Sequence, residues 1–199
     1  ISKSGVKVDG IDLYEPETPE AFATFQRRDL NALELPWPTE DRAYDLILLL
    51  DVVEHLDDPE NFLLSLRHSI NQKEKPTLLI SVPNVAFILM RLNLLLGRFN
   101  YADRGILDIS HRRFFTRRTL LRLLAETGYE VKSLRGVGVP FQSLSNNPLF
   151  RLAGRLSAAL AALWPSLFAF QFFCEVSVKL TTKQVLTGAK LYRRKSETV

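Results

Sequence analysis

The chain has 199 residues, of which 46% are hydrophobic, and a formal net charge of +4. That length and hydrophobic content suffice for one domain with a buried core, and a charged fraction of 24% argues against a chain that is disordered throughout. The single cysteine, Cys174, excludes a framework of intrachain disulfides and fits a reducing compartment, so we expect a cytoplasmic protein.

The first part of the chain carries signals for short strands. Residues 6–12 and 25–28 are predicted to be strands, and a helix is predicted to start at Pro16 or Pro19, because proline is favoured in the first helical turn. The apolar run at residues 45–50, DLILLL, predicts a buried strand.

A helix is predicted from about Pro59 to Asn71. Asp57 or Asp58 is expected to cap it, because a carboxylate accepts hydrogen bonds from the free N–H groups of the first turn. Its core face is predicted to consist of four apolar residues at helical spacing: Phe62, Leu63, Leu66 and Ile70.

The alternation continues in the second part of the chain. Residues 77–82 are predicted to form a buried strand that ends at Pro83, a helix is predicted from near Thr116 to Gly128, and residues 129–134 are predicted to form the next strand. Strands that alternate with helices predict an α/β fold with a mostly parallel sheet and helices on both faces. In such sheets ligands bind at the carboxyl ends of the strands. Three polar residues fall at these ends: Asp12, Asp51 and Asn84.

Residues 156–174 form an uncharged segment of 19 residues, which is close to the length that spans a bilayer. Pro165 interrupts the segment, and the periodicity changes there. Apolar residues recur at helical spacing from Leu149 to Leu163, whereas residues 168–178 alternate between apolar and other side chains. We therefore predict an amphipathic helix packed on the sheet, followed by a strand, rather than a transmembrane helix.

Motifs along the chain suggest a family. Five stretches, in this order, resemble successive motifs of class I S-adenosylmethionine-dependent methyltransferases: VDGIDLYEPE, RDLNALELP, YDLILLLDVVEHLDDP, LLISVPNVA and HRRFFTRRTLLRLLAETGYEV. The resemblance is nearest to the branch that contains small-molecule and ubiquinone-type O-methyltransferases and enzymes of surface-glycan pathways. It implies a Rossmann-like sheet with an antiparallel C-terminal strand, and transfer of a methyl group to an oxygen of a small-molecule or glycan-type acceptor. The alternative is a non-catalytic, methyltransferase-like binding or scaffold protein.

The resemblance also implies which residues bind S-adenosylmethionine. Asp12 would accept hydrogen bonds from the two ribose hydroxyls, and Leu13 would pack on the adenine. Asp29 and the backbone of Leu30 would meet the amino edge of the adenine, and Asp51 would lie near the methionine moiety. Without the resemblance, a turn aspartate at Asp12 and a capping or surface residue at Asp29 are the simpler interpretations.

The sequence departs from the family at its start, because no glycine-rich loop of the D/E-x-G-x-G type is present. The first residues, ISKSG, correspond to the end of the helix that follows this loop. In the family the missing first strand lies between the strands represented here by residues 6–12 and 45–50. We therefore expect an N-terminally truncated domain over residues 1–182, a natural protein that begins upstream, and a basic tail over residues 183–199.

The stretch DVVEHLDDP carries the candidate catalytic residues. If the chain turned helical at Asp51, then Glu54 and His55 would share a face with it, and the family folds the segment of His111 over the same place. One hypothesis makes His55 or His111 a general base, because imidazole ordinarily titrates near neutral pH. Another makes all four residues ligands of a divalent metal such as Mg²⁺, similar to an arrangement in small-RNA 2′-O-methyltransferases. In the simplest alternative, Glu54 and His55 only shape the start of a helix and His111 packs against aromatic residues. His68 is an internal control.

The residues after the predicted strand at 77–82 suggest how an acceptor is bound. An insertion over about 86–115 is expected to form a lid or a substrate-binding segment, and its apolar run ILMRLNLLLGRF suggests a lid or a peripheral membrane contact. Residues 91–122 contain eight arginines and two acids, which fits either a solvated face or an anionic acceptor. Four aromatic residues here could stack on a sugar or a base, or could belong to the core: Phe99, Tyr101, Phe114 and Phe115. Nucleic acid is not an expected partner, because no RNA-binding module is recognisable.

Overall fold

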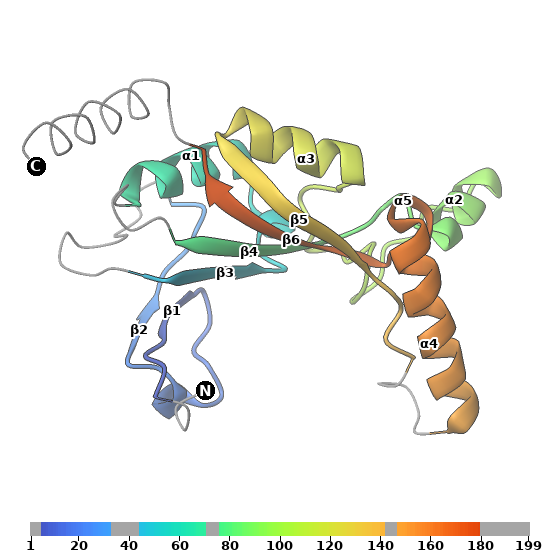
Figure 1. Ribbon diagram of the computed structural model, residues 1–199, viewed down its shortest axis with the longest axis horizontal. Coiled ribbons are helices and arrows are strands. Elements are labelled where there is room, and N and C mark those ends of the chain that lie inside the picture. The colour runs from blue at the N-terminus through green and yellow to red at the C-terminus, as the bar shows by residue number, and fades with distance from the viewer. Residues whose placement is uncertain (1–4, 33–43, 71–75, 142–146, 180–199) are drawn as a thin grey trace, which may run out of the picture.

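The computed structural model describes residues 5–32, 44–70, 76–141 and 147–179. The described strands form two sheets (Figure 1). Strands β1 (Asp9–Asp12) and β2 (Thr24–Arg27) pair in parallel in the smaller sheet. The larger sheet has the order β3-β4-β6-β5. Its members are β3 (Leu46–Leu50), β4 (Thr77–Pro83), β5 (Tyr129–Val137) and β6 (Gln171–Val178).

Strand directions follow the prediction. β3 and β4 are parallel, and β6 runs antiparallel to both of its neighbours, β4 and β5. Three of the four strands in the larger sheet therefore share one direction, and the C-terminal strand opposes them. This arrangement confirms the predicted α/β, Rossmann-like fold class. Among the described residues, β1 is paired with β2 and not with β3.

Helices α1 (Pro59–Ser69) and α3 (Arg117–Glu126) cover one face of the larger sheet (Figure 1). Their apolar residues join those of the strands in one buried cluster, and the buried Tyr129 hydroxyl donates a hydrogen bond to the Leu63 carbonyl at 2.9 Å. On β3 the burial alternates: Ile47 is buried, whereas Leu48 on the opposite side is 49% exposed. The predicted burial of this strand is therefore seen on one face only.

The helix boundaries follow local signals. Asp58 caps α1 by accepting a hydrogen bond from the Asn61 N–H, as predicted, and Pro59 is its first residue. Thr116 caps α3, and Gly128 follows that helix with a φ of +83°, a conformation that favours glycine. The predicted core face of α1 is buried throughout: Phe62, Leu63, Leu66 and Ile70.

Two local predictions were wrong. The helix expected at Pro16 or Pro19 is a single 3-10 turn, Pro19–Ala21. The chain is not helical at Asp51, where φ is +53°, and a 3-10 helix begins only at Val53 and ends at His55. Asp51 therefore does not share a helical face with Glu54 and His55.

The remaining helices gather at one end of the molecule (Figure 1). They are α2 (Ile88–Leu95), α4 (Pro148–Leu163) and α5 (Pro165–Phe168). A helix that ends before Pro165 and a later strand are confirmed, but a short helix, α5, follows Pro165, so the strand starts at Gln171 and not at residue 168. Within the described ranges, the helices fall short of the combined length and hydrophobicity that a membrane span requires. The predicted basic tail, residues 183–199, lies outside the described residues.

The packing of α4 corrects one expectation. Its apolar stripe was expected to pack on the sheet, yet Leu152 and Leu156 are mostly exposed. The helix instead packs through small residues: Ala161 is fully buried, and a Cβ placed on Gly136 of β5 would lie 2.6 Å from the Ala161 carbonyl oxygen. Close approach of α4 to β5 therefore depends on Gly136.

Candidate active site

Asp51 lies directly after β3 in a strained conformation. Its φ of +53° is unusual for a residue with a side chain, and such strain concentrates at functional sites. Its carboxylate Oδ1 accepts hydrogen bonds from the Ser81 hydroxyl, at 3.0 Å, and from the Gln171 side-chain amide. The ends of β4 and β6 therefore hold the Asp51 carboxylate in place.

Glu54, in the 3-10 helix that follows, is a buried carboxyl group. Its residue is 1% exposed, and among the described residues neither carboxylate oxygen has a hydrogen-bond partner. Burial, with a smaller contribution from the charge of Asp51, raises the pKa of Glu54 from an ordinary 4.5 to about 8. A buried acid without partners is costly unless a ligand or a cation uses it.

A loop from the segment before α3 folds over this 3-10 helix. The backbone N–H groups of Arg112 and Arg113 both donate to the Glu54 carbonyl oxygen, at 2.8 and 3.0 Å. This anchoring brings His111 to His55, with 4.8 Å between the ring centroids. The two histidines are therefore neighbours in space, although 55 residues separate them in the chain.

The hydrogen bonds of the two histidines determine which ring nitrogen can accept a proton or bind a metal ion. Nδ1 of His55 lies 3.3 Å from the Ser110 carbonyl oxygen, and Nδ1 of His111 lies 3.1 Å from the Ile106 carbonyl oxygen. A carbonyl oxygen only accepts hydrogen bonds, so the neutral rings carry their protons on Nδ1. Each Nε2 then offers a lone pair, either to a proton or to a metal ion.

Glu54, His55 and His111 also form a group with metal-ligating potential. One donor atom from each lies within 4.8 Å of the others. Two ligands of one ion at about 2.1 Å each can be at most about 4.2 Å apart, so the widest pair would have to close slightly. Asp51, the fourth predicted ligand, is outside this group, and its Oδ1 is bonded to Ser81 and Gln171.

The predicted ribose-binding and adenine-binding residues lie at the ends of the smaller sheet. Asp12 ends β1 and is exposed, and its Oδ1 accepts a hydrogen bond from the Tyr14 N–H at 2.9 Å. Leu13 is 46% exposed beside it. Asp29 follows β2 and accepts a hydrogen bond from the Asn31 N–H. Both aspartates stabilise turns in this structure, and both remain open to solvent.

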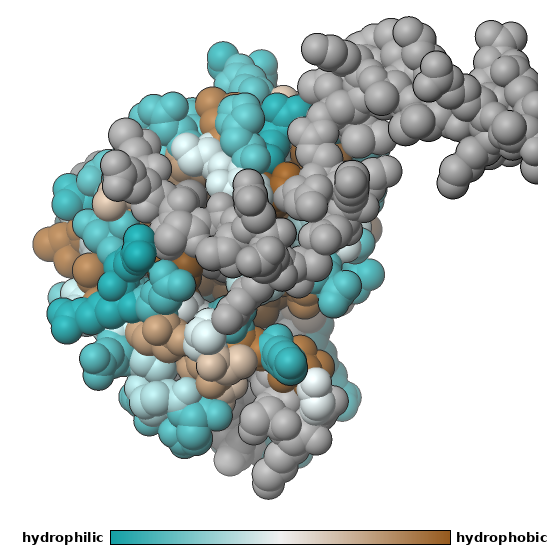
Figure 2. Space-filling model, turned by 90° about the vertical axis from the view of Figure 1, so that its left-hand side faces the viewer, coloured by the Kyte–Doolittle hydropathy of each residue, from teal (hydrophilic) through white to brown (hydrophobic). Residues whose placement is uncertain are grey.

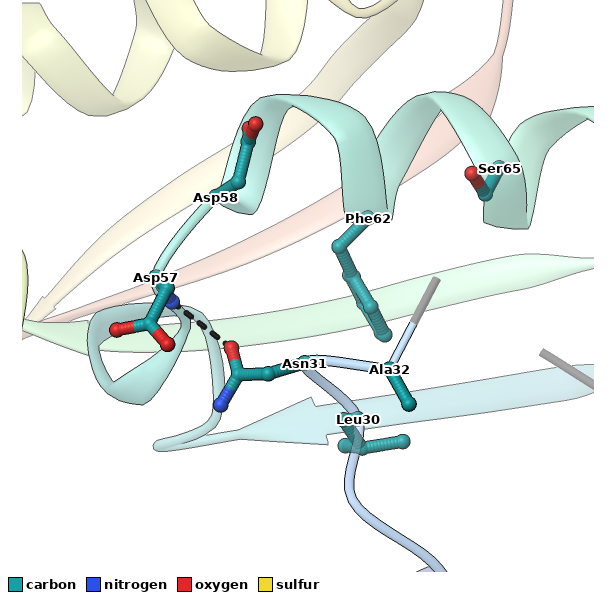
Figure 3. Close-up of a pocket in the computed structure, with 7 residues that line it drawn as sticks. All are labelled: Leu30, Asn31, Ala32, Asp57, Asp58, Phe62 and Ser65. Atoms are coloured by element: carbon teal, nitrogen blue, oxygen red, sulfur yellow. Dashed lines mark hydrogen bonds between the residues drawn. The ribbon is translucent and has the colours of Figure 1, made fainter. Parts of the chain in front are cut away.

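A pocket of about 140 Å³ lies between the loop after β2 and the start of α1 (Figure 3). Leu30 is the one predicted cofactor residue that lines it. The Asp57 N–H donates to the Asn31 side-chain oxygen across the pocket, at 2.8 Å. Seven residues line the pocket: Leu30, Asn31, Ala32, Asp57, Asp58, Phe62 and Ser65.

Two residues of this site, Ser81 and Gln171, were not predicted from the sequence. Their strands carry the signal, because a polar residue in an otherwise apolar strand such as LLISV is unusual, but their partner depends on how the strands align. Asn84, which was predicted at a strand end, has a structural role: it is fully buried, and its amide donates to the Ala169 carbonyl oxygen at 2.8 Å.

Several of the arginines between residues 91 and 122 have structural partners. Arg112 pairs with Asp57 at 3.5 Å, and Arg122 pairs with Glu126 at 2.8 Å. Arg113 pairs with Glu60 at 3.2 Å. These pairs favour the interpretation of a solvated face for that part of the segment.

Comparison with known proteins identifies the family. Residues 1–134 match the family model described as a methyltransferase domain. Among curated proteins, the chain is 24% identical over 143 residues to the ubiquinone biosynthesis O-methyltransferase of Rickettsia typhi. The matched region covers 69% of this chain and 56% of that protein. The chain thus spans little more than half the length of this curated relative.

Solved structures show the same fold at low sequence identity. A SAM-dependent methyltransferase from Archaeoglobus fulgidus gives a TM-score of 0.53 at 16% identity, covering 89% of this chain and 78% of that one. A 1,6-didemethyltoxoflavin-N1-methyltransferase from Burkholderia thailandensis, solved with S-adenosylhomocysteine, gives a TM-score of 0.52 at 13% identity. That match covers 90% of this chain and 64% of the Burkholderia chain. The family match over residues 1–134 places this chain among the methyltransferase domains, and these structures show that it has the fold of class I S-adenosylmethionine-dependent methyltransferases.

Proposed function

We propose that this protein transfers a methyl group from S-adenosylmethionine to an oxygen atom of a small-molecule or glycan-type acceptor. The observation that carries the proposal is the pair of adjacent histidines, His55 and His111, whose Nδ1 atoms face carbonyl oxygens and leave each Nε2 to accept a proton. O-methylation also agrees with the activity named for the Rickettsia typhi relative.

The residues at the strand ends suit the cofactor. An exposed carboxylate at the end of β1, that of Asp12, can accept both protons of a ribose diol. Leu13, Asp29 and Leu30 would line the adenine side, and Asp51 would lie near the methionine side. When bound, the cofactor would supply the electrophilic methyl group of its sulfonium, whose bond to sulfur breaks to leave S-adenosylhomocysteine.

His55 or His111 would act as the base that takes the proton of the acceptor hydroxyl at Nε2, while the oxygen forms its new bond to the methyl carbon. The imidazolium produced in this way would lie close to Glu54. A nearby positive charge favours the ionised form of a carboxyl group, so Glu54 would stabilise the protonated histidine. The buried carboxyl group thereby gains a role in the site.

A bound metal ion is the competing mechanism for the same residues. Glu54, His55 and His111 would hold a divalent ion, which would lower the pKa of the acceptor hydroxyl. Both Nδ1 atoms already contact carbonyl oxygens, as is usual behind histidine ligands. Two imidazoles and one carboxylate favour a transition-metal ion over Mg²⁺.

Transfer of a tritiated methyl group to a panel of phenols, glycosides and amines tests the proposal. We expect label in the hydroxylated acceptors, and a rate that falls about a hundredfold in His55→Ala and in His111→Ala. His68→Ala is the matched control, because His68 is an exposed residue of α1 away from the cluster, and its rate should match the wild type. Transfer to amines alone would refute O-methylation.

Chelation distinguishes the two mechanisms. Loss of activity in EDTA, restored by Mn²⁺ or Zn²⁺, supports the metal, whereas indifference to EDTA supports the general base. Tight binding of S-adenosylhomocysteine with no transfer to any class of acceptor would favour the second candidate function, a non-catalytic binding or scaffold protein.

A further inference from the structure

Helices α2 and α4 lie at one end of the molecule (Figure 1), and both expose hydrophobic residues. On α4 they form one stripe at spacings of three and four residues, which is the face of a helix. At the end of α2, Leu95 is 82% exposed, as is Leu163 at the end of α4. We call this the apolar–basic surface, and its exposed apolar members include Leu95, Leu96, Leu152, Leu156, Leu163 and Trp164.

The same surface is positively charged. Residues 86–107 contain three arginines and one acid, and residues 147–170 contain two arginines and no acid, so the two segments together carry a formal charge of +4. Arg151 and Arg155 are exposed beside the leucine stripe of α4. The side chain of Arg91 donates to the Ser166 carbonyl oxygen at 3.3 Å and joins α2 to the turn that starts α5. This hydrogen bond therefore links α2 to α5, the short helix that follows α4.

We propose that the apolar–basic surface docks on an anionic lipid bilayer. Helices that lie in the bilayer interface combine an apolar face of leucine and tryptophan with flanking basic residues, and negatively charged lipids attract the basic residues. A second copy of the chain is the competing occupant. Two such surfaces would bring like charges of +4 together, whereas an anionic bilayer complements them.

The opposite end of the molecule differs. Figure 2 views it from that side, and among the residues that are not grey, hydrophilic side chains predominate and hydrophobic residues occur in small groups. The exposed leucines of α4 are not part of the buried core, because α4 packs on the sheet through Ala161. A membrane could therefore cover the stripe without unfolding the helix.

The surface is connected to the candidate active site by aromatic rings. His111 contacts Phe114 with 6.3 Å between ring centroids, Phe114 contacts Phe99 at 5.9 Å, and Phe99 contacts Tyr101 at 5.6 Å. Phe99 and Tyr101 are partly exposed just after α2. Docking would thus bring this chain of rings, which ends at His111, close to the bilayer. Docking itself does not depend on the proposed function.

Cosedimentation with vesicles tests the proposal on the full chain. We expect binding to vesicles of phosphatidylcholine with phosphatidylglycerol, weak binding to phosphatidylcholine alone, and release by salt. Arg151→Gln with Arg155→Gln should lower the partition coefficient about 25-fold, at about fivefold for each arginine. The matched control, Arg118→Gln with Lys132→Gln, removes the same charge from α3 and β5 and should bind nearly as the wild type does.

A second pair of variants tests the apolar contribution. Leu156→Glu with Leu163→Glu should lower binding at least about tenfold, with unchanged thermal unfolding because both leucines are exposed. Equal binding to both kinds of vesicle, or no binding to either, would overturn the proposal. So would a dimer in sedimentation equilibrium that the leucine variants dissociate, because the surface would then belong to a second copy.

Discussion

Replacing Glu54 by glutamine should remove a pH dependence of folding stability. The pKa of Glu54 is raised to about 8 in the folded protein, chiefly by burial, and is near 4.5 when unfolded. Between these values the folded state binds more protons than the unfolded state, so the free energy of unfolding falls as the pH rises. For one carboxyl group with these two pKa values, raising the pH from about 6 to about 8 lowers the free energy of unfolding by about 2 kcal/mol.

Urea unfolding of the wild type and of Glu54→Gln at both pH values measures the effect. The wild type should lose about 2 kcal/mol more than the variant, which cannot ionise at this position. Equal losses in the two proteins would refute the assignment of a buried, protonated Glu54. If the cluster binds a divalent ion, adding that ion should flatten the wild-type dependence, because a metal-bound carboxylate stays ionised.

Three further predictions concern the residues around the site and the core. Ser81→Ala and Gln171→Ala each remove a donor to Asp51 and should lower the free energy of unfolding by about 1 to 3 kcal/mol in urea titrations, whereas an unchanged value would show that the strained loop does not need them. Tyr129→Phe removes the buried hydrogen bond to the Leu63 carbonyl and should cost about 1 kcal/mol in the same assay. Gly128→Ala should destabilise the fold by more than about 1 kcal/mol, because φ is +83° there and the new Cβ would lie 2.7 Å from the Arg67 guanidinium carbon; a neutral result would contradict this packing.

Elements that depend on nearby residues could be predicted from the sequence. The start of α1 follows from Asp58 and Pro59, and the end of α3 follows from Gly128, because caps act within one turn of the helix. The end of α4 before Pro165 and the strand β6 that follows α5 likewise show as a change of period within a few residues.

Features that depend on tertiary contacts could not be predicted. The stripe of α4 shows that it is a helix, but the period does not reveal which side packs, and the small residue Ala161 supplies the contact. Ser81 and Gln171 meet Asp51 only because β4 and β6 align as they do. The proximity of His55 and His111 was predicted through the family resemblance, since no local pattern connects them.

Titration of S-adenosylhomocysteine into the protein, followed by calorimetry, tests the central claim most directly. We predict binding that Asp12→Ala weakens by about 1.5 to 3 kcal/mol, because the exposed carboxylate at the end of β1 is assigned to the ribose hydroxyls. The control is Asp45→Ala, which removes an exposed carboxylate at the amino end of β3 and should leave the affinity unchanged. An equal affinity in the wild type and Asp12→Ala would contradict a cofactor site at these strand ends.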